Sequence, residues 1–129
     1  MNDKVNYWIE IAEYDLNTAK AMMKTKRFLY VGFMCHQTIE KILKAMHVVK
    51  FPTETPLYTH DLLKLAKITN LFEKMSQEQK ETIRALQPLN LESRYPSYKD
   101  DIFSSLSKER CAFILNQTEG LFQWVKEQL

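Results

Sequence analysis

The stretch that decides the fold is VGFMCHQTIEKILKAMHVV, which runs from Val31 to Val49. Its apolar residues recur every three or four positions, the spacing that places side chains on one face of an α-helix. This face is wide, so we expect a central helix with neighbours on more than one side, as in a helical bundle. The polar residues are expected on the remaining helix surface. The apolar face consists of Val31, Cys35, Thr38, Ile42, Ala45 and Val49, widened by Met34, Ile39, Leu43 and Met46, and the polar surface consists of His36, Gln37, Glu40, Lys41, Lys44 and His47.

Two further long helices are predicted near the ends of the chain. Asn2 or Asp3 can cap a first helix that runs to about Thr25. A last helix is expected to start around Ser105 or Ser107 and shows the same helical spacing. The apolar stripes are Val5, Trp8, Ala12, Leu16, Ala19 and Met23 in the first helix, and Cys111, Leu115, Thr118, Phe122, Val125 and Leu129 in the last.

Two short helices are predicted between these long ones. Thr59 is the expected N-cap of a third helix that ends near Asn70. Ser76 and Gln79 fit a capping box, which opens a fourth helix that Pro88 stops. The chain is therefore expected to form an all-α fold, an antiparallel up-and-down bundle of about five helices.

The composition agrees with a single helical domain over residues 1–129. Two glycines and four prolines are few for a sandwich or barrel, which needs a turn every ~8–12 residues. A hydrophobic content of 45% supports a core without disulfides, so Cys35 and Cys111 are expected to be buried free thiols. The net charge of +2 does not by itself indicate a nucleic-acid-binding protein. We expect no metal and no cofactor, because the histidines and cysteines show no metal-ligand spacing.

The sequence contains no predicted membrane segment. A transmembrane helix needs ~20 consecutive apolar residues, and no stretch of this chain reaches that length. The N-terminal residues MNDKVNYW lack the apolar run of a signal peptide. We therefore expect a cytoplasmic protein that does not bind a membrane.

The segment from Glu92 to Tyr98, ESRYPSY, is the first candidate for a functional loop. The planar guanidinium of Arg94 suits a phosphate or a carboxylate, and tyrosines can stack on bases or donate a hydroxyl hydrogen bond. Alternatively, Arg94 pairs with an internal carboxylate, and Tyr95 or Tyr98 packs the loop against the domain.

A second candidate is an acidic residue beside an apolar stripe. Asp15 lies next to the stripe of the first helix and needs a partner, because burying an unpaired charge costs several kcal/mol. Arg94, Lys41 and Lys44 are the candidate partners. We hypothesise that Asp15, Glu40 and Arg94 form a polar cluster that crosses the bundle and pairs charges structurally rather than catalytically.

Four groups of residues in this chain together match a known pattern in their order and separation. The groups are Trp8, Ala12, Asp15-Leu16 and Ala19; Cys35-His36-Gln37, Glu40-Lys41 and Leu43-Lys44-Ala45; Thr59-His60-Asp61-Leu62; and Arg94-Tyr95-Pro96. On these residues the chain resembles the HEPN domain family (higher eukaryotes and prokaryotes nucleotide-binding) over nearly its whole length.

The resemblance implies a helical bundle similar to the substrate-binding helical domain of kanamycin nucleotidyltransferase, paired as a homodimer. Family members are often encoded beside a minimal nucleotidyltransferase, as toxin and antitoxin. Many are metal-independent endoribonucleases, whose signature is an arginine followed a few residues later by a histidine. No histidine follows Arg94 here, although RNA cleavage needs a group that moves the 2′-hydroxyl proton.

The function expected from the resemblance is therefore a nucleotide- or nucleic-acid-binding subunit that partners a minimal nucleotidyltransferase and lacks the catalytic motif. Arg94, helped by Lys41 and Lys44, would contact phosphate. Tyr95 or Tyr98 would orient Arg94 or stack on a base.

Two alternatives remain open. One is a divergent metal-independent endoribonuclease toxin that uses Arg94 with Tyr98, or with His36 or His60 from across a dimer. The other is a structural protein-interaction module whose polar cluster only fixes the register of the helices.

Overall fold

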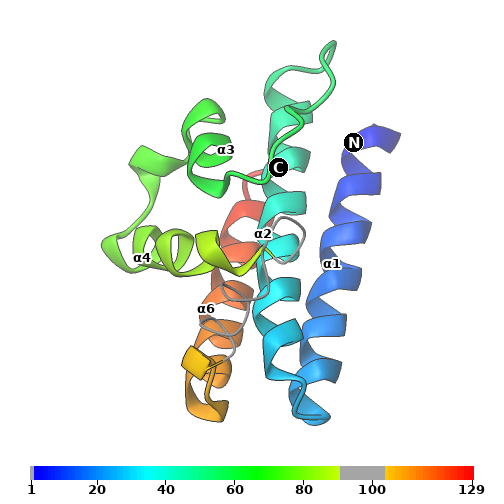
Figure 1. The fold of residues 1–129 in the computed structure, drawn as a ribbon. Coiled ribbons are helices and arrows are strands. Elements are labelled where there is room, and N and C mark those ends of the chain that lie inside the picture. The colour runs from blue at the N-terminus through cyan, green and yellow to red at the C-terminus, as the bar shows by residue number, and fades with distance from the viewer. Residues whose placement is uncertain (1, 91–103) are drawn as a thin grey trace.

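The computed structural model describes residues 2–90 and 104–129, and the regular elements in this part of the chain are helices (Figure 1). Its α-helices are α1 (Asp3–Lys24), α2 (Phe28–Lys50), α3 (Leu62–Ile68), α4 (Gln77–Leu86) and α6 (Lys108–Lys126). Two 3₁₀ turns, Phe72–Lys74 and Gln87–Leu89, follow α3 and α4. The predicted all-α bundle is confirmed.

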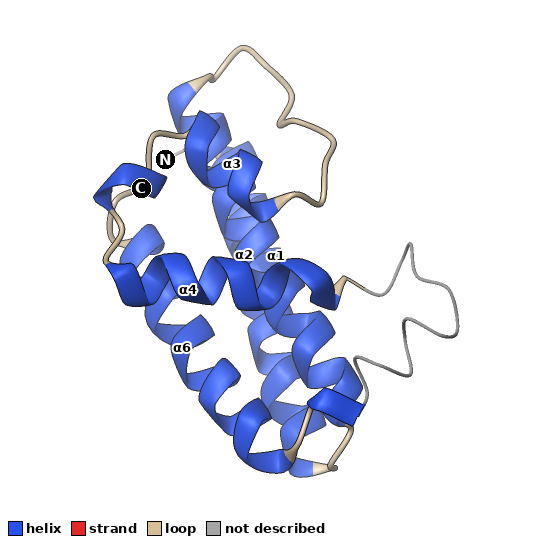
Figure 2. Cartoon of the chain, turned by 60° about the vertical axis from the view of Figure 1, so that its left-hand side comes forward, coloured by secondary structure: helices blue, strands red, loops and turns tan. Residues whose placement is uncertain are grey.

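The long helices α1, α2 and α6 pack along one another. Lys20 on α1 pairs with Glu119 on α6 at 2.7 Å, and Glu13 pairs with Lys126 at 3.3 Å, so α1 and α6 run in opposite directions. The α1–α2 hairpin is also antiparallel, whereas α4 lies across the long helices (Figure 2). This arrangement surrounds α2 with other helices.

The core is centred on α2, as its wide apolar pattern predicted. Every residue from Cys35 to Val48 except Lys41 is buried, and Cys111 on α6 is also fully buried. Both cysteines are free thiols, as expected. Val49, predicted on the apolar face, is instead 39% exposed, because it lies in the last turn of α2 next to the connector that begins at Phe51.

The expectation that the polar residues of α2 lie on its surface is wrong. The side chains of His36, Gln37, Glu40, Lys44 and His47 are all buried. Helical periodicity separates faces of one helix, but it does not show how many neighbours cover them. Here α1, α3, α4 and α6 all contact α2, so its polar face is covered as well.

Helix capping follows the sequence at most positions. The side chain of Asn2 accepts from the backbone of Val5, and Ser107 caps α6. The capping box of Ser76 and Gln79 is present. The cap of α3 was predicted two residues too early: it is Asp61, not Thr59. Thr59 Oγ1 instead accepts from the backbone N–H of Asp61, which shapes the turn before the helix.

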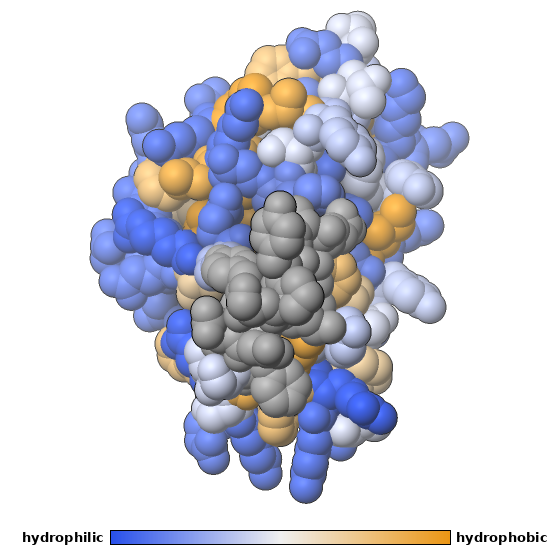
Figure 3. Space-filling model, in the orientation of Figure 1, coloured by the Kyte–Doolittle hydropathy of each residue, from blue (hydrophilic) through white to orange (hydrophobic). Residues whose placement is uncertain are grey.

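Hydrophilic residues cover most of the coloured surface on the face shown in Figure 3, where hydrophobic residues form small groups separated by hydrophilic ones. In the part of the chain that the structure describes, no helix combines the length and apolarity needed to cross a membrane.

Candidate functional site

A group of buried and half-buried polar side chains, which we name the Glu40 cluster, lies between α2 and the connector that leads to α3. Residues four apart on a helix lie on the same face, so the side chains of His36, Glu40 and Lys44 follow one another along one face of α2, one turn apart. The connector brings a histidine against the same face. The members of the cluster are His36, Gln37, Glu40, Lys41, Lys44 and His60.

Glu40 is the centre of the cluster and is only 1% exposed. Its Oε1 lies 2.8 Å from Nδ1 of His60, and its Oε2 lies 3.1 Å from Nζ of Lys44 and 3.7 Å from Nζ of Lys41. Burial raises the pKa of this carboxyl, but the hydrogen bond from His60 and the two lysines outweigh burial and hold the pKa below its usual value. Glu40 is therefore a buried, ionised acceptor.

His36 ties the connector to α2. Its ring is fully buried, and its Nε2 lies 3.2 Å from the backbone carbonyl oxygen of His60. Burial, the largest cause, lowers the pKa of His36 to about 4, so the ring is neutral near pH 7. A carbonyl only accepts, so Nε2 carries the proton and donates it, while Nδ1 faces the amide of Gln37 at 3.5 Å.

His60 is thus held at two points, by its ring and by its backbone. Because Glu40 is ionised and can only accept, Nδ1 of His60 is the donor in their 2.8 Å hydrogen bond. In the neutral ring the lone pair then lies on Nε2. The side chain of His60 is 34% exposed, so this ring links a buried carboxylate to the surface. A carboxylate that orients an imidazole in this way prepares the imidazole for proton transfer or for contact with an anion.

The residues after His60 fasten the same segment to α4. Asp61 accepts from the backbone N–H of Lys64 at 3.1 Å and from Nε2 of Gln87 at 2.8 Å. The other end of the Gln87 amide accepts from the backbone N–H of Leu62 at 3.0 Å. The position of His60 therefore depends on α2, the start of α3 and the end of α4 together.

The two lysines of the cluster differ in exposure. The side chain of Lys44 is only 8% exposed, and its ammonium lies 5.7 Å from the ring centroid of Trp8, close enough for a cation–π contact. Lys41 is 18% exposed and donates to Oε1 of Gln37 at 2.6 Å. Lys41 is thus the lysine that reaches toward solvent, whereas Lys44 is committed to Glu40.

The sequence-predicted residues fall into two groups, of which the first comes together in the structure. Glu40, Lys41 and Lys44 meet in the Glu40 cluster. Asp15 interacts electrostatically with the same cluster: burial raises its pKa most, Lys41 lowers it, and Glu40 raises it further. The hypothesis that Asp15, Glu40 and Arg94 form one polar cluster stays a prediction, because Arg94 lies outside the described residues.

The second group, Arg94, Tyr95 and Tyr98, lies outside the described residues, and the hypothesis that they form a site stays a prediction. The residue that sequence reasoning underweighted is His60, which was considered only as an alternative. Its signal was the run Thr59-His60-Asp61, in which a helix cap follows the histidine directly and fixes the backbone there.

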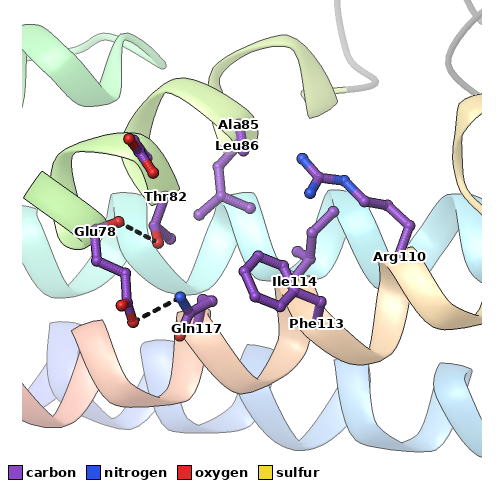
Figure 4. Close-up of a pocket in the computed structure, with 9 residues that line it drawn as sticks. Glu78, Thr82, Ala85, Leu86, Arg110, Phe113, Ile114 and Gln117 are labelled. Carbon is purple, nitrogen blue, oxygen red and sulfur yellow. Dashed lines mark hydrogen bonds between the residues drawn. The ribbon is translucent and has the colours of Figure 1, made fainter.

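A separate pocket of about 180 Å³ lies between α4 and α6 (Figure 4). Arg110 reaches over the ring of Phe113, and Glu78 accepts from the amide of Gln117 at 2.8 Å. No member of the Glu40 cluster lines this pocket. Among residues 2–90 and 104–129, no three His, Cys, Asp or Glu side chains are grouped so that they could hold a metal ion.

Comparisons with known proteins agree with the fold. The chain is similar to the crystal structure of TT1696 from Thermus thermophilus, with a TM-score of 0.79 and 19% sequence identity, and the match covers 99% of this chain and 100% of that one. A search of curated proteins finds no match. The model of the HEPN domain matches residues 5–128. Since this match spans nearly the whole chain, the protein belongs to the HEPN domain family.

Proposed function

We propose that this protein is a nucleotide- or nucleic-acid-binding subunit whose phosphate-contacting surface lies over the Glu40 cluster. Membership of the HEPN family supports a nucleotide- or RNA-related module. The observation that carries the proposal is the buried Glu40, which accepts a hydrogen bond from the partly exposed His60 and lies 3.7 Å from the ammonium of the partly exposed Lys41.

The charges of the cluster favour an anion. One carboxylate, Glu40, lies within 4 Å of two ammonium groups, those of Lys41 and Lys44, so these three groups taken together carry one excess positive charge. Asp15 is electrostatically coupled to the same groups: burial, the largest cause, raises its pKa, Lys41 lowers it and Glu40 raises it. A phosphate can take a hydrogen bond from Lys41 and lie beside the ring of His60 without breaking the pairing of Lys44 with Glu40. The proposal also includes Arg94 as a phosphate contact and Tyr95 as its neighbour.

Calorimetric titration with ATP, GTP and a short oligoribonucleotide tests this function. We expect binding that weakens on Lys41→Ala and on Arg94→Ala and strengthens at lower salt. Lys24→Ala is the matched control, because Lys24 is exposed in the last turn of α1, away from the cluster. Absence of binding for all three ligands at millimolar concentration contradicts the proposal, and so does equal weakening by the Lys24 variant.

The proposal extends to assembly. HEPN domains often form dimers, and we propose that this chain forms a homodimer and partners a minimal nucleotidyltransferase in a toxin–antitoxin pair. Light scattering on the purified protein tests the homodimer, with a monomeric mass as the contradicting result. Co-expression with the product of a neighbouring nucleotidyltransferase gene tests the partnership, and separate elution of the two proteins would contradict it.

The pairing of Glu40 with His60 favours one second function, metal-independent RNA cleavage. In that reaction the 2′-hydroxyl oxygen of RNA attacks the adjacent phosphorus and passes its proton to the imidazole of His60. The bond from phosphorus to the 5′-oxygen breaks, the 5′-oxygen takes a proton from water, and a 2′,3′-cyclic phosphate remains. An imidazole that donates one ring N–H to a carboxylate is oriented for general base catalysis. Cleavage of RNA that persists in EDTA and disappears in the His60→Ala variant supports this function. Absence of cleavage at high protein concentration contradicts it.

A further inference from the structure

Tyr58 is the most exposed of the large hydrophobic side chains in the described part of the chain, at 93%. It lies in the connector between α2 and α3, two residues before His60, and the two ring centroids are 6.2 Å apart. Lys44 of the Glu40 cluster lies between two aromatic rings, with its Nζ 6.0 Å from the centroid of Tyr58 and 5.7 Å from that of Trp8. An exposed aromatic ring therefore stands directly beside the proposed phosphate site.

Packing in the core does not account for this tyrosine. Trp8 is partly buried against the hydrophobic core, whereas Tyr58 buries almost none of its surface. The connector that carries Tyr58 is anchored two residues later, because the carbonyl of His60 is held by His36 and the ring of His60 is held by Glu40. Tyr58 is a solvated ring on an anchored segment, and its surface is open to a flat ligand.

We propose that Tyr58 is a stacking platform for an unpaired nucleobase whose phosphate lies at Lys41 and His60. This inference rests on the proposed function, and it names the ligand chemistry: an unstacked base joined to a phosphate, from a free nucleotide or from single-stranded RNA. Aromatic side chains beside cationic groups bind single strands in this way, because every base presents a flat π-face. Lys44 adds a positive charge next to the same ring.

A stacking platform at Tyr58 distinguishes ligands that carry a base from ligands that carry only phosphates, which a phosphate site alone does not do. A ligand with phosphates but no base can reach Lys41 and His60, yet it gains nothing from Tyr58. A base–aromatic stack contributes ~1–3 kcal/mol per base, which corresponds to a change in affinity of about 5- to 150-fold. Inorganic tripolyphosphate is therefore the reference probe, and ATP and an oligoribonucleotide are the base-carrying probes.

The experiment measures the affinities of ATP, tripolyphosphate and a single-stranded oligoribonucleotide for the wild-type protein, Tyr58→Ala and Tyr58→Phe. We expect Tyr58→Ala to weaken the base-carrying ligands by about 5- to 150-fold and to leave tripolyphosphate unchanged. Tyr58→Phe keeps the ring and should bind like wild type. Tyr30→Ala, at a tyrosine 46% exposed near the start of α2, is the matched control and should also bind like wild type.

The outcomes separate this inference from the proposed function. If the wild-type protein binds base-carrying ligands and Tyr58→Ala does not weaken them, or weakens tripolyphosphate equally, the stacking platform is refuted while phosphate binding stands. If the wild-type protein binds none of the three probes, both are refuted. Loss confined to ATP identifies a free nucleotide as the ligand, and loss confined to the oligoribonucleotide identifies a single strand. Because Tyr58 is 93% exposed, far-UV circular dichroism should show an unchanged fold in each variant.

Discussion

Replacing Glu40 by leucine should destabilise the protein strongly. Glu40 is the carboxylate that balances the charge of Lys44, and the side chain of that lysine is 8% exposed. Glu40→Leu leaves the ammonium of Lys44 buried without its partner and removes the acceptor for Nδ1 of His60. Breaking a buried ion pair from one side typically costs ~3–5 kcal/mol. That is a large share of the ~5–15 kcal/mol by which a folded domain is usually stable.

A double-mutant cycle separates the cost of the uncompensated Lys44 charge from the cost of losing the Glu40 side chain. Lys44→Met removes the buried charge and keeps a similar volume, so the double variant Glu40→Leu/Lys44→Met has no uncompensated ammonium at this position. Replacing a whole buried ion pair with apolar residues is often nearly neutral. We therefore expect the double variant to be more stable than Glu40→Leu alone, with an interaction free energy of at least ~1 kcal/mol.

Urea denaturation followed by circular dichroism measures these free energies of unfolding, provided that the slope with urea is the same for all four proteins. Lys20→Met is the control, because Lys20 pairs with Glu119 where both side chains are 42% exposed, and an exposed pair contributes only ~0–1 kcal/mol. The reasoning is refuted if Glu40→Leu costs less than ~1 kcal/mol, or if the two changes add within ~0.5 kcal/mol.

Four further predictions concern stability and the accessibility of buried groups. Gly120 has nothing within 4 Å of the position of an added Cβ, so Gly120→Ala should raise the free energy of unfolding by ~0.5–1 kcal/mol. At Gly32 that Cβ would lie 3.1 Å from a side-chain atom of Leu89, so Gly32→Ala should gain less or destabilise; a larger gain in the urea midpoint there than at Gly120 would contradict this. Burial raises the pKa of the Cys35 thiol to about 12, so a thiol reagent should modify Cys35 only on unfolding, and rapid labelling of the native protein would contradict that. Burial lowers the pKa of His36 from 6.5 to about 4, so between those pH values only the unfolded chain binds a proton there, and the free energy of unfolding should fall by up to ~3 kcal/mol as pH drops through this window. His36→Gln should lose this part of the pH dependence, and parallel pH profiles for the two proteins would refute it.

The local signals in the sequence predicted the helices well, because helix formation depends on nearby residues. The spacing of apolar residues placed the long helices. Ser76 was correctly predicted as the cap of α4, and Asn2 and Ser107, each one of two predicted alternatives, cap α1 and α6. The start of α3 was less predictable, because Thr59 and Asp61 are both good caps, and contacts elsewhere decide between them. Gln87, at the end of α4, binds Asp61 and selects it.

The sequence by itself determined the helical class of this protein, its family, and the residue types available for its candidate site. Only the tertiary structure decided that Glu40 and Lys44 are buried and that His60, twenty positions after Glu40, completes their hydrogen bonding. The physical reason is that periodicity reports one helix at a time. Burial and ion pairing depend on which other segments cover a face, and that is settled by the packing of the whole chain around α2.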